Sequence, residues 1–343
     1  MFRLATPTPS QSTVTTHSSG QPSPPSSPDR PEPRPGTRRR PHLRSALASV
    51  LALGLLIGIG GCGDQGGSAK NGSGSSGNGN AGGDANPAAE NAPAAKALKA
   101  VKIGLSLDTL REERWQRDRD QFVARAEELG ATVLVQAANN DDAVQNAQAE
   151  NLLTQGVDVL VVAPHNAKSA ATIVEAAHKS GVPVIAYDRL INDCDLDLYI
   201  SFDNLRVGEM QAEYAVEHAP TGKYVLIAGA PTDNNAHLYR EGQLNILQPY
   251  VDRGEIEIVT DQFANDWQPV EGLKILENAL TRNHNDIAAV VASNDGLAGG
   301  AIQALAEQKL TGKVIVTGQD AELAACRRIV EGSQSMTVYK PIR

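Results

Sequence analysis

From Val101 onward, short apolar runs alternate with longer amphipathic stretches, and this alternation limits the possible folds more than any other feature. It is typical of βα units, in which helices cover a mostly parallel sheet. The apolar runs predict strands at 101–107, 132–136, 157–163, 182–187, 224–229, 288–292 and 314–318. The amphipathic stretches predict helices at 112–129, 142–155, 168–180, 207–217, 235–247, 269–282, 296–308 and 322–331. Segments 198–202 and 334–339 are expected to be strands that end a lobe or cross between lobes.

Polar clusters directly follow several of the predicted strands. They are Asp108–Arg114, Pro164-His165-Asn166, Asp188-Arg189, Asp233-Asn234-Asn235, Ser293-Asn294-Asp295 and Gln319-Asp320. Open α/β sheets bind ligands at the carboxyl ends of their strands. This part of the chain, about 240 residues, is long enough for two compact lobes. If the two halves form two facing sheets, these clusters converge on one cleft, which would suit a small polyol.

The charge of the chain is unevenly distributed and argues against a nucleic-acid partner. Seven of the 31 Lys and Arg residues and two of the 40 Asp and Glu residues lie in 1–61, so the remainder has 24 basic and 38 acidic residues, a net charge of −14. Phosphate contacts require clustered Lys and Arg. Aromatic residues make up only 4% of the chain, too few for stacking along a single strand.

The three cysteines, Cys62, Cys194 and Cys326, are far apart and have no CxxC spacing. Metal or redox chemistry is therefore not expected, and no cofactor is implied. Cys194 and Cys326 are predicted to be isolated thiols. The sequence also has no nucleophile elbow and no evident acid/base pair, so no catalytic residue is assigned and the chain is not expected to be an enzyme.

The N-terminal region is typical of an export signal. Arginines at 38, 39, 40 and 44 precede the apolar run 46–61, which is short for a membrane span but suits a signal-peptide core. The run ends at Ile59-Gly60-Gly61-Cys62, which resembles a bacterial lipobox, and this resemblance implies a lipidated Cys62. A membrane anchor that is never cleaved is the alternative. Both interpretations place the body outside the cytoplasm, in the periplasm or on the cell-envelope side of the membrane.

Further along, a series of short motifs resembles the ribose/galactose-type sugar-binding family of periplasmic binding proteins (type 1). The motifs are Asp108–Asp120, Gly156–Leu160, Tyr187–Arg189, Tyr199–Asn204, Val207–Glu209, Asp233–Ala236, Val291–Asp295, Gly318–Ala321 and Thr337–Pro341. Each motif is weak alone, but their order and spacing make the resemblance specific. It implies two Rossmann-like lobes with parallel sheets joined by a hinge, and a monosaccharide ligand, D-xylose or a related aldose.

The resemblance implies a set of sugar-contacting residues: Arg114, Arg189, Asn235, Trp267, Asn294, Asp320 and Lys340. Trp115 and Asp108 are further candidates. The chemistry of the side chains supports this set, because a sugar presents neighbouring hydroxyls that both donate and accept hydrogen bonds. Charged groups buried in such a cleft need partners, and Lys340 is expected to pair with Asp320.

Simpler interpretations remain open for several of these residues. Arg189 could form a surface ion pair with Asp188, and Trp115 could be a core residue on an apolar helical stripe. Of Asn294 and Asp295, one could cap a helix while the other binds. His165 is interpreted as a loop histidine without a role. Segment 139–142 is expected to be a turn with an N-cap, and Arg111, Arg117 and Arg119 are expected to lie on a solvated helix face.

These observations predict five segments. They are a signal peptide with a long Pro/Ser/Arg-rich n-region (1–61), a lipidated cysteine with a flexible Gly/Ser/Asn/Ala linker (62–100), an N-terminal lobe (101–204), a C-terminal lobe (205–336) and the start of a second hinge crossing (337–343). The family normally continues beyond this crossing. The resemblance therefore implies that the C-terminal part of the first lobe is missing and that this lobe is less stable.

The resemblance implies a monomeric binding lipoprotein that delivers the sugar to an ABC transporter permease with its ATPase, and that touches the membrane only through its lipid. The alternative is a sensor subunit that presents the sugar to a chemoreceptor or a sensor kinase. A sugar-responsive transcription regulator would need a basic helix-turn-helix where this chain has a signal and a linker. A secreted glycosidase could use Asp108 and Asp320 as its carboxylate pair, but the motifs disfavour it.

Overall fold

Two parallel sheets organise the protein in the computed structural model, which describes residues 100–342. The predicted signal peptide, Cys62 and linker lie outside this range. The first sheet has the strand order β2-β1-β3-β4-β5 and every neighbouring pair in it is parallel. Its strands are β1 (Lys102–Leu107), β2 (Thr132–Ala137), β3 (Val159–Ala163), β4 (Val184–Tyr187) and β5 (Leu198–Ile200). The helices between them are α1 (Glu113–Glu128), α2 (Asp142–Thr154) and α3 (Ala171–Lys179).

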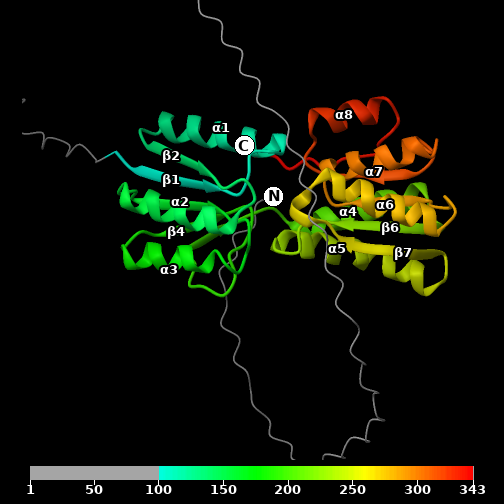
Figure 1. The fold of residues 1–343 in the computed structure, drawn as a ribbon, viewed down its shortest axis with the longest axis horizontal. Helices are drawn as coiled ribbons and strands as arrows, with labels where there is room; N and C mark the ends of the chain where they lie inside the picture. The colour runs from blue at the N-terminus through cyan, green and yellow to red at the C-terminus, as the bar shows by residue number, and fades with distance from the viewer. Residues whose placement is uncertain (1–99, 343) are drawn as a thin grey trace, which may run out of the picture. The chain divides into compact units, whose positions relative to one another are not determined.

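The second sheet follows the same construction and has the strand order β7-β6-β8-β9 (Figure 1). Its strands are β6 (Gly222–Ala228), β7 (Ile256–Phe263), β8 (Ala289–Ala292) and β9 (Ile315–Thr317). Its helices are α4 (Asn204–His218), α5 (Asn234–Asp252), η1 (Asn265–Trp267), α6 (Pro269–Arg282), α7 (Asp295–Glu307) and α8 (Leu323–Val330). Two all-parallel sheets with interleaved helices confirm the predicted α/β fold.

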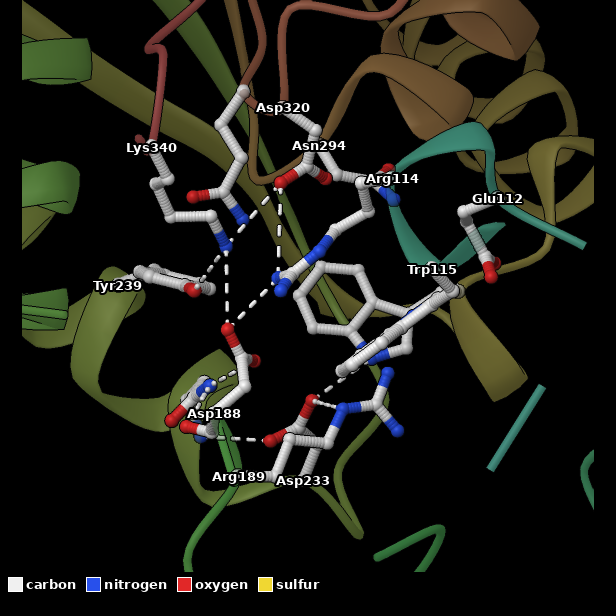
Figure 2. A pocket seen from close by; sticks show the side chains of 13 residues that line it. Glu112, Arg114, Trp115, Asp188, Arg189, Asp233, Tyr239, Asn294, Asp320 and Lys340 are labelled. Atoms are coloured by element: carbon white, nitrogen blue, oxygen red, sulfur yellow. Dashed lines mark hydrogen bonds and ion pairs between the residues drawn. The ribbon is translucent and has the colours of Figure 1, made fainter. Parts of the chain in front are cut away.

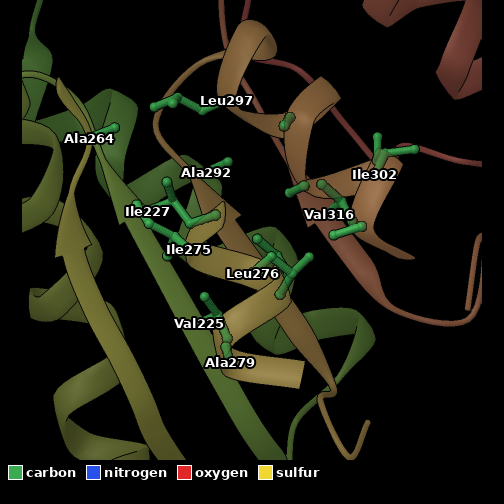
Figure 3. Packing of buried hydrophobic residues seen from close by; sticks show 14 of the residues in the cluster. Val225, Ile227, Ala264, Ile275, Leu276, Ala279, Ala292, Leu297, Ile302 and Val316 are labelled. Atoms are coloured by element: carbon green, nitrogen blue, oxygen red, sulfur yellow. The ribbon is translucent and has the colours of Figure 1, made fainter. Parts of the chain in front are cut away.

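Both faces of the second sheet are covered, because successive side chains of a strand point to opposite faces. From β6, Val225 and Ile227 pack against α6 and α7, as Figure 3 shows for Ile275 and Leu276 of α6. The alternate residues Tyr224 and Leu226 pack on the other face, with residues of α4 and α5. This double burial explains why β6 is a nearly continuous apolar run in the sequence.

The first sheet divides its side chains in the same way. Leu160 and Val162 of β3 belong to a core shared with α2 and α3, whereas Val161 lies in a core with Trp115 of α1. The ends of the strands are thereby held rigidly, and the loops that follow them carry the polar clusters found in the sequence. The helix starts are fixed as well: Asp141, Asp203, Asp233 and Asn294 each accept a backbone N–H of the helix they cap.

Two expectations about strands are wrong. Segment 256–263 is an additional strand, β7, which the sequence pattern did not reveal because Glu257 and Asp261 interrupt its apolar residues. It lies at the sheet edge, where only Ile256 and Thr260 of its residues are fully buried. Segment 334–339 is not a strand, since it forms only one isolated parallel bridge, between Val338 and Gln319. The described part of the chain contains no helix with the length and apolarity needed to cross a membrane.

Candidate functional site

Loops after strands of both sheets meet around one pocket, shown in Figure 2. The pocket has a volume of about 310 Å³ when the open solvent at its mouth is included. Its lining is dominated by planar charged and polar side chains with three aromatic rings. The lining residues are Glu112, Arg114, Trp115, Asp188, Arg189, Asp233, Asn235, Tyr239, Trp267, Asn294, Gln319, Asp320 and Lys340.

Asp188 is the central carboxylate of the pocket. Arg114 Nη1 donates to Asp188 Oδ2 over 2.8 Å, and Lys340 Nζ lies 4.0 Å from the same oxygen. Asn235 Nδ2 donates to Asp188 Oδ1 over 3.1 Å. Burial would raise the pKa of Asp188, but Arg114 and Lys340 outweigh it and hold the pKa at about 2. Asp188 is therefore ionised at neutral pH and can accept hydrogen bonds only.

Arg189 connects residues that belong to different sheets. Its Nη1 donates to Asp108 Oδ2 over 2.6 Å, and its Nε lies 2.9 Å from Oδ2 of Asp233, the N-cap residue of α5. Its side chain is only 6% exposed. Burial alone would lower the pKa of Arg189, but the carboxylates of Asp233 and Asp108 outweigh burial and raise it. A buried guanidinium without a partner would strongly destabilise the fold, and the two carboxylates compensate its charge.

The two tryptophans form the apolar surfaces of the pocket. Trp115 lies under both arginines, with Arg114 Cζ 4.2 Å and Arg189 Cζ 5.2 Å from its ring centroid. The indole of Trp267 packs directly on Gly229, where a Cβ would lie 2.0 Å from the ring, and Trp267 Nε1 donates to Asp233 over 3.2 Å. Only a glycine at position 229 allows this contact.

Lys340 and Asp320 form the other end of the pocket. Their Nζ and Oδ1 atoms are 3.2 Å apart, which confirms the pairing expected from the sequence, and Lys340 also donates to the hydroxyl of Tyr239 over 3.3 Å. Three pocket residues, Asp188, Trp267 and Asp320, have positive φ angles of 63°, 57° and 97°. Non-glycine residues with such angles are concentrated at functional sites, where the strain serves positioning.

The structure brings the candidate residues together as follows. The pocket is lined by all seven residues of the predicted set and by the additional candidate Trp115; the seven are Arg114, Arg189, Asn235, Trp267, Asn294, Asp320 and Lys340. Asp108 does not line the pocket; it lies behind Arg189 as its counter-ion. Trp115 is part of the core on α1 and also lines the pocket, so its interpretation as a core residue is compatible with its interpretation as a candidate sugar contact.

Several simpler interpretations are wrong. Asp188 and Arg189 are buried and bind other partners, so they are not a surface ion pair. Asn294 both caps α7 and lines the pocket, whereas Asp295 is turned away toward Gln334 and Thr337. Arg117 is not only solvated, because it donates to the backbone carbonyl of Asp320 over 3.0 Å.

The expectation that Arg111 lies on a solvated helix face is also wrong, because its guanidinium donates to the backbone carbonyl of Asp266 over 2.6 Å. Arg119 pairs only with its exposed neighbour Asp120, as a solvated residue does. Segment 139–142 contains the expected turn, with positive φ at Asn139 and Asn140 and an N-cap at Asp141.

Sequence reasoning did not assign roles to Glu112, Asp188, Asp233, Tyr239 and Gln319, although all line the pocket. Four of them lie within the polar clusters after strands, so their position was a usable signal. Tyr239 had none, because it lies inside a helix. His165 was given no role, yet it is buried and contacts Asp108 and Asp266.

The arrangement can donate and accept many directed hydrogen bonds but has no features of a reaction centre. Among residues 100–342, no group of three His, Cys, Asp or Glu residues is placed to hold a metal ion, and Cys194 and Cys326 are free thiols. Asp188, Asp233 and Asp320 offer acceptors, while Arg114, Arg189 and Lys340 offer donors, on all sides of a small ligand. Such an arrangement can bind a compact molecule rich in hydroxyl groups.

A family model described as a periplasmic binding protein domain matches residues 103–343. The chain belongs to this family. It is 57% identical over 244 residues to the D-xylose-binding periplasmic protein of Escherichia coli (strain K12), which covers 71% of this chain and 74% of the relative. The D-xylose-binding periplasmic protein of Haemophilus influenzae is 56% identical over 244 residues, which again cover 71% of this chain and 74% of the relative.

Solved structures of periplasmic binding proteins share the fold. The carbohydrate transporter solute-binding protein of Chloroflexus aurantiacus, in complex with D-glucose, has a TM-score of 0.65 and 34% identity, and covers 71% of this chain and 80% of that structure. The type 1 periplasmic binding protein fold expected from the sequence is thus confirmed. Proteins of this family are substrate receptors and not enzymes.

Proposed function

We propose that this chain is a sugar-binding periplasmic protein that holds a monosaccharide, D-xylose in the first instance, in the pocket around Asp188 and Arg189. The observation that carries the proposal is the set of buried, mutually paired carboxylates and guanidinium groups that surround a pocket of about 310 Å³. The D-xylose-binding proteins of two bacteria are 57% and 56% identical to this chain, which favours D-xylose within the sugars.

Each part of the pocket has a role in this proposal. The guanidinium groups of Arg114 and Arg189 donate paired hydrogen bonds to neighbouring ring hydroxyls, and Asp188 and Asp320 accept from them. Asn235 and Asn294 can do both at once. The indoles of Trp115 and Trp267 face the C–H surface of the sugar ring. Because the contributing loops come from both sheets, sugar binding would hold the two halves together about the hinge.

We further propose that the sugar-bound protein delivers its ligand to an ABC transporter permease, from a position on the outer side of the membrane and attached through lipidated Cys62. The membership of the periplasmic binding protein family and the sequence 60–62 support this step. Presentation of the sugar to a chemoreceptor or a sensor kinase is the second candidate for the same bound form.

The experiment is a calorimetric titration of the full chain with D-xylose, D-ribose, L-arabinose, D-glucose and D-galactose. A dissociation constant in the micromolar range or below, about −8 kcal/mol or more, is expected for D-xylose. A clear preference for another sugar would overturn the choice of ligand, and absence of binding to all five would overturn the proposed function. A radiolabelled uptake assay in cells with and without the gene then separates delivery from sensing.

A further inference from the structure

The imidazole of His165 lies between two carboxylates that belong to different halves of the molecule. His165 follows β3, and its Nδ1 is 3.0 Å from Oδ1 of Asp108, which follows β1 of the same sheet. Its Nε2 is 3.8 Å from Oδ1 of Asp266, in the η1 segment that follows β7 of the second sheet. The side chains of His165 and Asp108 are 9% and 1% exposed, so water screens their contact weakly, whereas the side chain of Asp266 is 36% exposed.

The backbone of His165 is fixed at the same junction. Its N–H donates to Gln145 Oε1 over 2.8 Å, and its carbonyl accepts from Thr232 Oγ1, a residue of the second half, over 3.3 Å. The neighbouring N–H of Ala167 donates to the Thr232 carbonyl over 2.9 Å. These contacts fix the main chain from which the imidazole extends toward its two carboxylates.

The protonation state of this imidazole determines how many of the two carboxylates it can bind. Neutral imidazole has one N–H donor and one lone pair, whereas the imidazolium ion has two N–H donors. With Asp108 3.0 Å from one nitrogen and Asp266 3.8 Å from the other, only the cation directs an N–H at each carboxylate, and at 3.8 Å the contact with Asp266 is an ion pair and not a hydrogen bond. A neutral ring would direct its lone pair at one of the carboxylates, which is unfavourable.

This contact is connected to the proposed sugar site through Arg189. One oxygen of Asp108 lies 3.0 Å from Nδ1 of His165, the other accepts from Arg189, and Arg189 in turn pairs with Asp233. Asp266 directly precedes Trp267, the residue that packs on Gly229 and donates to Asp233. Asp266 is thus linked through Trp267 to Asp233, and both Trp267 and Asp233 line the pocket.

We propose that His165 is a positioning residue that, when protonated, holds Asp108 against Arg189 and ties it to Asp266, so that sugar binding is coupled to proton uptake. The inference rests on the proposed function. It predicts that sugar affinity decreases as the pH rises, because the neutral ring loses one of its two contacts and the halves are joined less firmly.

The local charges agree with this assignment. The charged groups that face His165 are Asp108, Asp266 and Arg189; Gln145 and Thr232 are uncharged. The hydrogen bond to Asp108 raises the pKa of His165, against the opposing effects of burial and Arg189. A group whose pKa is raised in this way stabilises the state that has the contact at low pH and loses that contribution as the pH rises through its pKa.

The test measures sugar affinity by calorimetry from pH 5.5 to pH 8.5 in the full chain and in three variants. D-xylose is the probe, and buffers with different ionisation enthalpies give the number of protons taken up. His165→Gln keeps an uncharged donor but cannot titrate. Asp266→Asn removes the carboxylate of the second half at a partly exposed position, and serves if His165→Gln fails to fold. His178→Gln is the control, because His178 also pairs with a carboxylate, Asp197, but both residues belong to the first half.

We expect the unmodified chain and His178→Gln to bind about three- to tenfold more weakly at pH 8 than at pH 6, since one linked proton changes affinity by at most tenfold per pH unit. They should take up a measurable fraction of a proton near pH 7. His165→Gln and Asp266→Asn should flatten the pH dependence and lose the uptake. Equal pH profiles and equal uptake in all four proteins would overturn the role of His165 and leave the proposed function intact. If none of the five sugars binds at any pH, the proposed function fails and this inference fails with it.

Discussion

Nε of Arg189 and Oδ2 of Asp233 lie 2.9 Å apart, although Arg189 follows the fourth strand of the first sheet and Asp233 caps a helix of the second. The same guanidinium donates to Asp108 in the first half. One side chain thus joins the two halves and lines the pocket. Changes at this position are therefore expected to affect ligand affinity and the contact between the halves together.

Replacing Arg189 or Asp320 by alanine is expected to weaken sugar binding at least about tenfold in each case, because each change leaves buried polar partners unsatisfied. Calorimetric titration with D-xylose measures the effect. Arg206→Ala is the matched control, since Arg206 forms exposed ion pairs with Glu209 and Glu213 on the surface of α4. Unchanged affinity in the Arg189 or Asp320 variant would contradict the site.

Gly229→Ala is expected to weaken sugar binding by about tenfold or more while the protein remains folded. The added Cβ would lie 2.0 Å from the indole of Trp267 and force the ring to move, and misplaced contact surfaces of this kind lose binding energy. Gly296→Ala is the control, because the nearest atom to its added Cβ would lie at 3.5 Å. Equal affinities for the two variants would indicate that Trp267 does not contact the sugar.

Asp188→Asn is expected to destabilise the protein by about 3 kcal/mol in urea unfolding at pH 7, the lower end of the cost of breaking a buried pair, since Arg114 keeps Asp118 and Lys340 keeps Asp320. Because the pKa of Asp188 is lowered to about 2, its contribution is complete above the ordinary pKa of an aspartate and is lost as the pH falls toward 2. The difference between variant and unmodified chain should therefore shrink in acid.

As a control for this change, Asp286→Asn removes one partner of an exposed pair with Lys223 and should cost no more than about 0.5 kcal/mol. A similar, small loss in both variants would mean that Asp188 is solvated and not the buried centre of the pocket.

Glu322→Gln is expected to stabilise the protein by about 1 kcal/mol at pH 8, after discounting for partial exposure, and to have little effect near pH 5. Burial, together with Asp320, Asp295, Glu112 and Glu113, raises the pKa of Glu322 to about 7. An acid with a raised pKa binds a proton in the folded state that the unfolded state releases, so stability falls as the pH rises from the ordinary pKa of a glutamate to about 7, and the full cost is present above 7. Thermal unfolding at the two pH values measures this, and an equal shift at both would contradict it.

The sequence predicted the fold well because the strands that are buried on both faces are short apolar runs, as for Val157–Ala163 and Tyr224–Gly229. The edge strand β7 was missed because its exposed side carries Glu257 and Asp261, which interrupt the apolar pattern. An edge strand has one partner strand only, so less of its surface must be apolar.

The sequence predicted many of the residues that line the pocket, but fewer of the contacts between them. Strand ends and family motifs pointed to Arg189, Asp320 and Lys340 and to the pairing of Lys340 with Asp320, yet neither indicated which carboxylates face Arg189. The pairing of Arg189 with Asp233 depends on how two sheets meet, which local sequence does not encode. His165 was missed for the same reason, since Asp108 and Asp266 become its neighbours only in three dimensions.

Tryptophan fluorescence offers the most direct test of the central claim, because the two tryptophans of the chain, Trp115 and Trp267, both line the pocket. Titration with D-xylose should give a saturable change in emission with a dissociation constant in the micromolar range or below, and the change should be lost or shifted at least about tenfold in Arg189→Ala. Sugar binding that is detected by calorimetry but leaves the emission unchanged, or an unaltered titration in Arg189→Ala, would contradict a sugar site between these two rings.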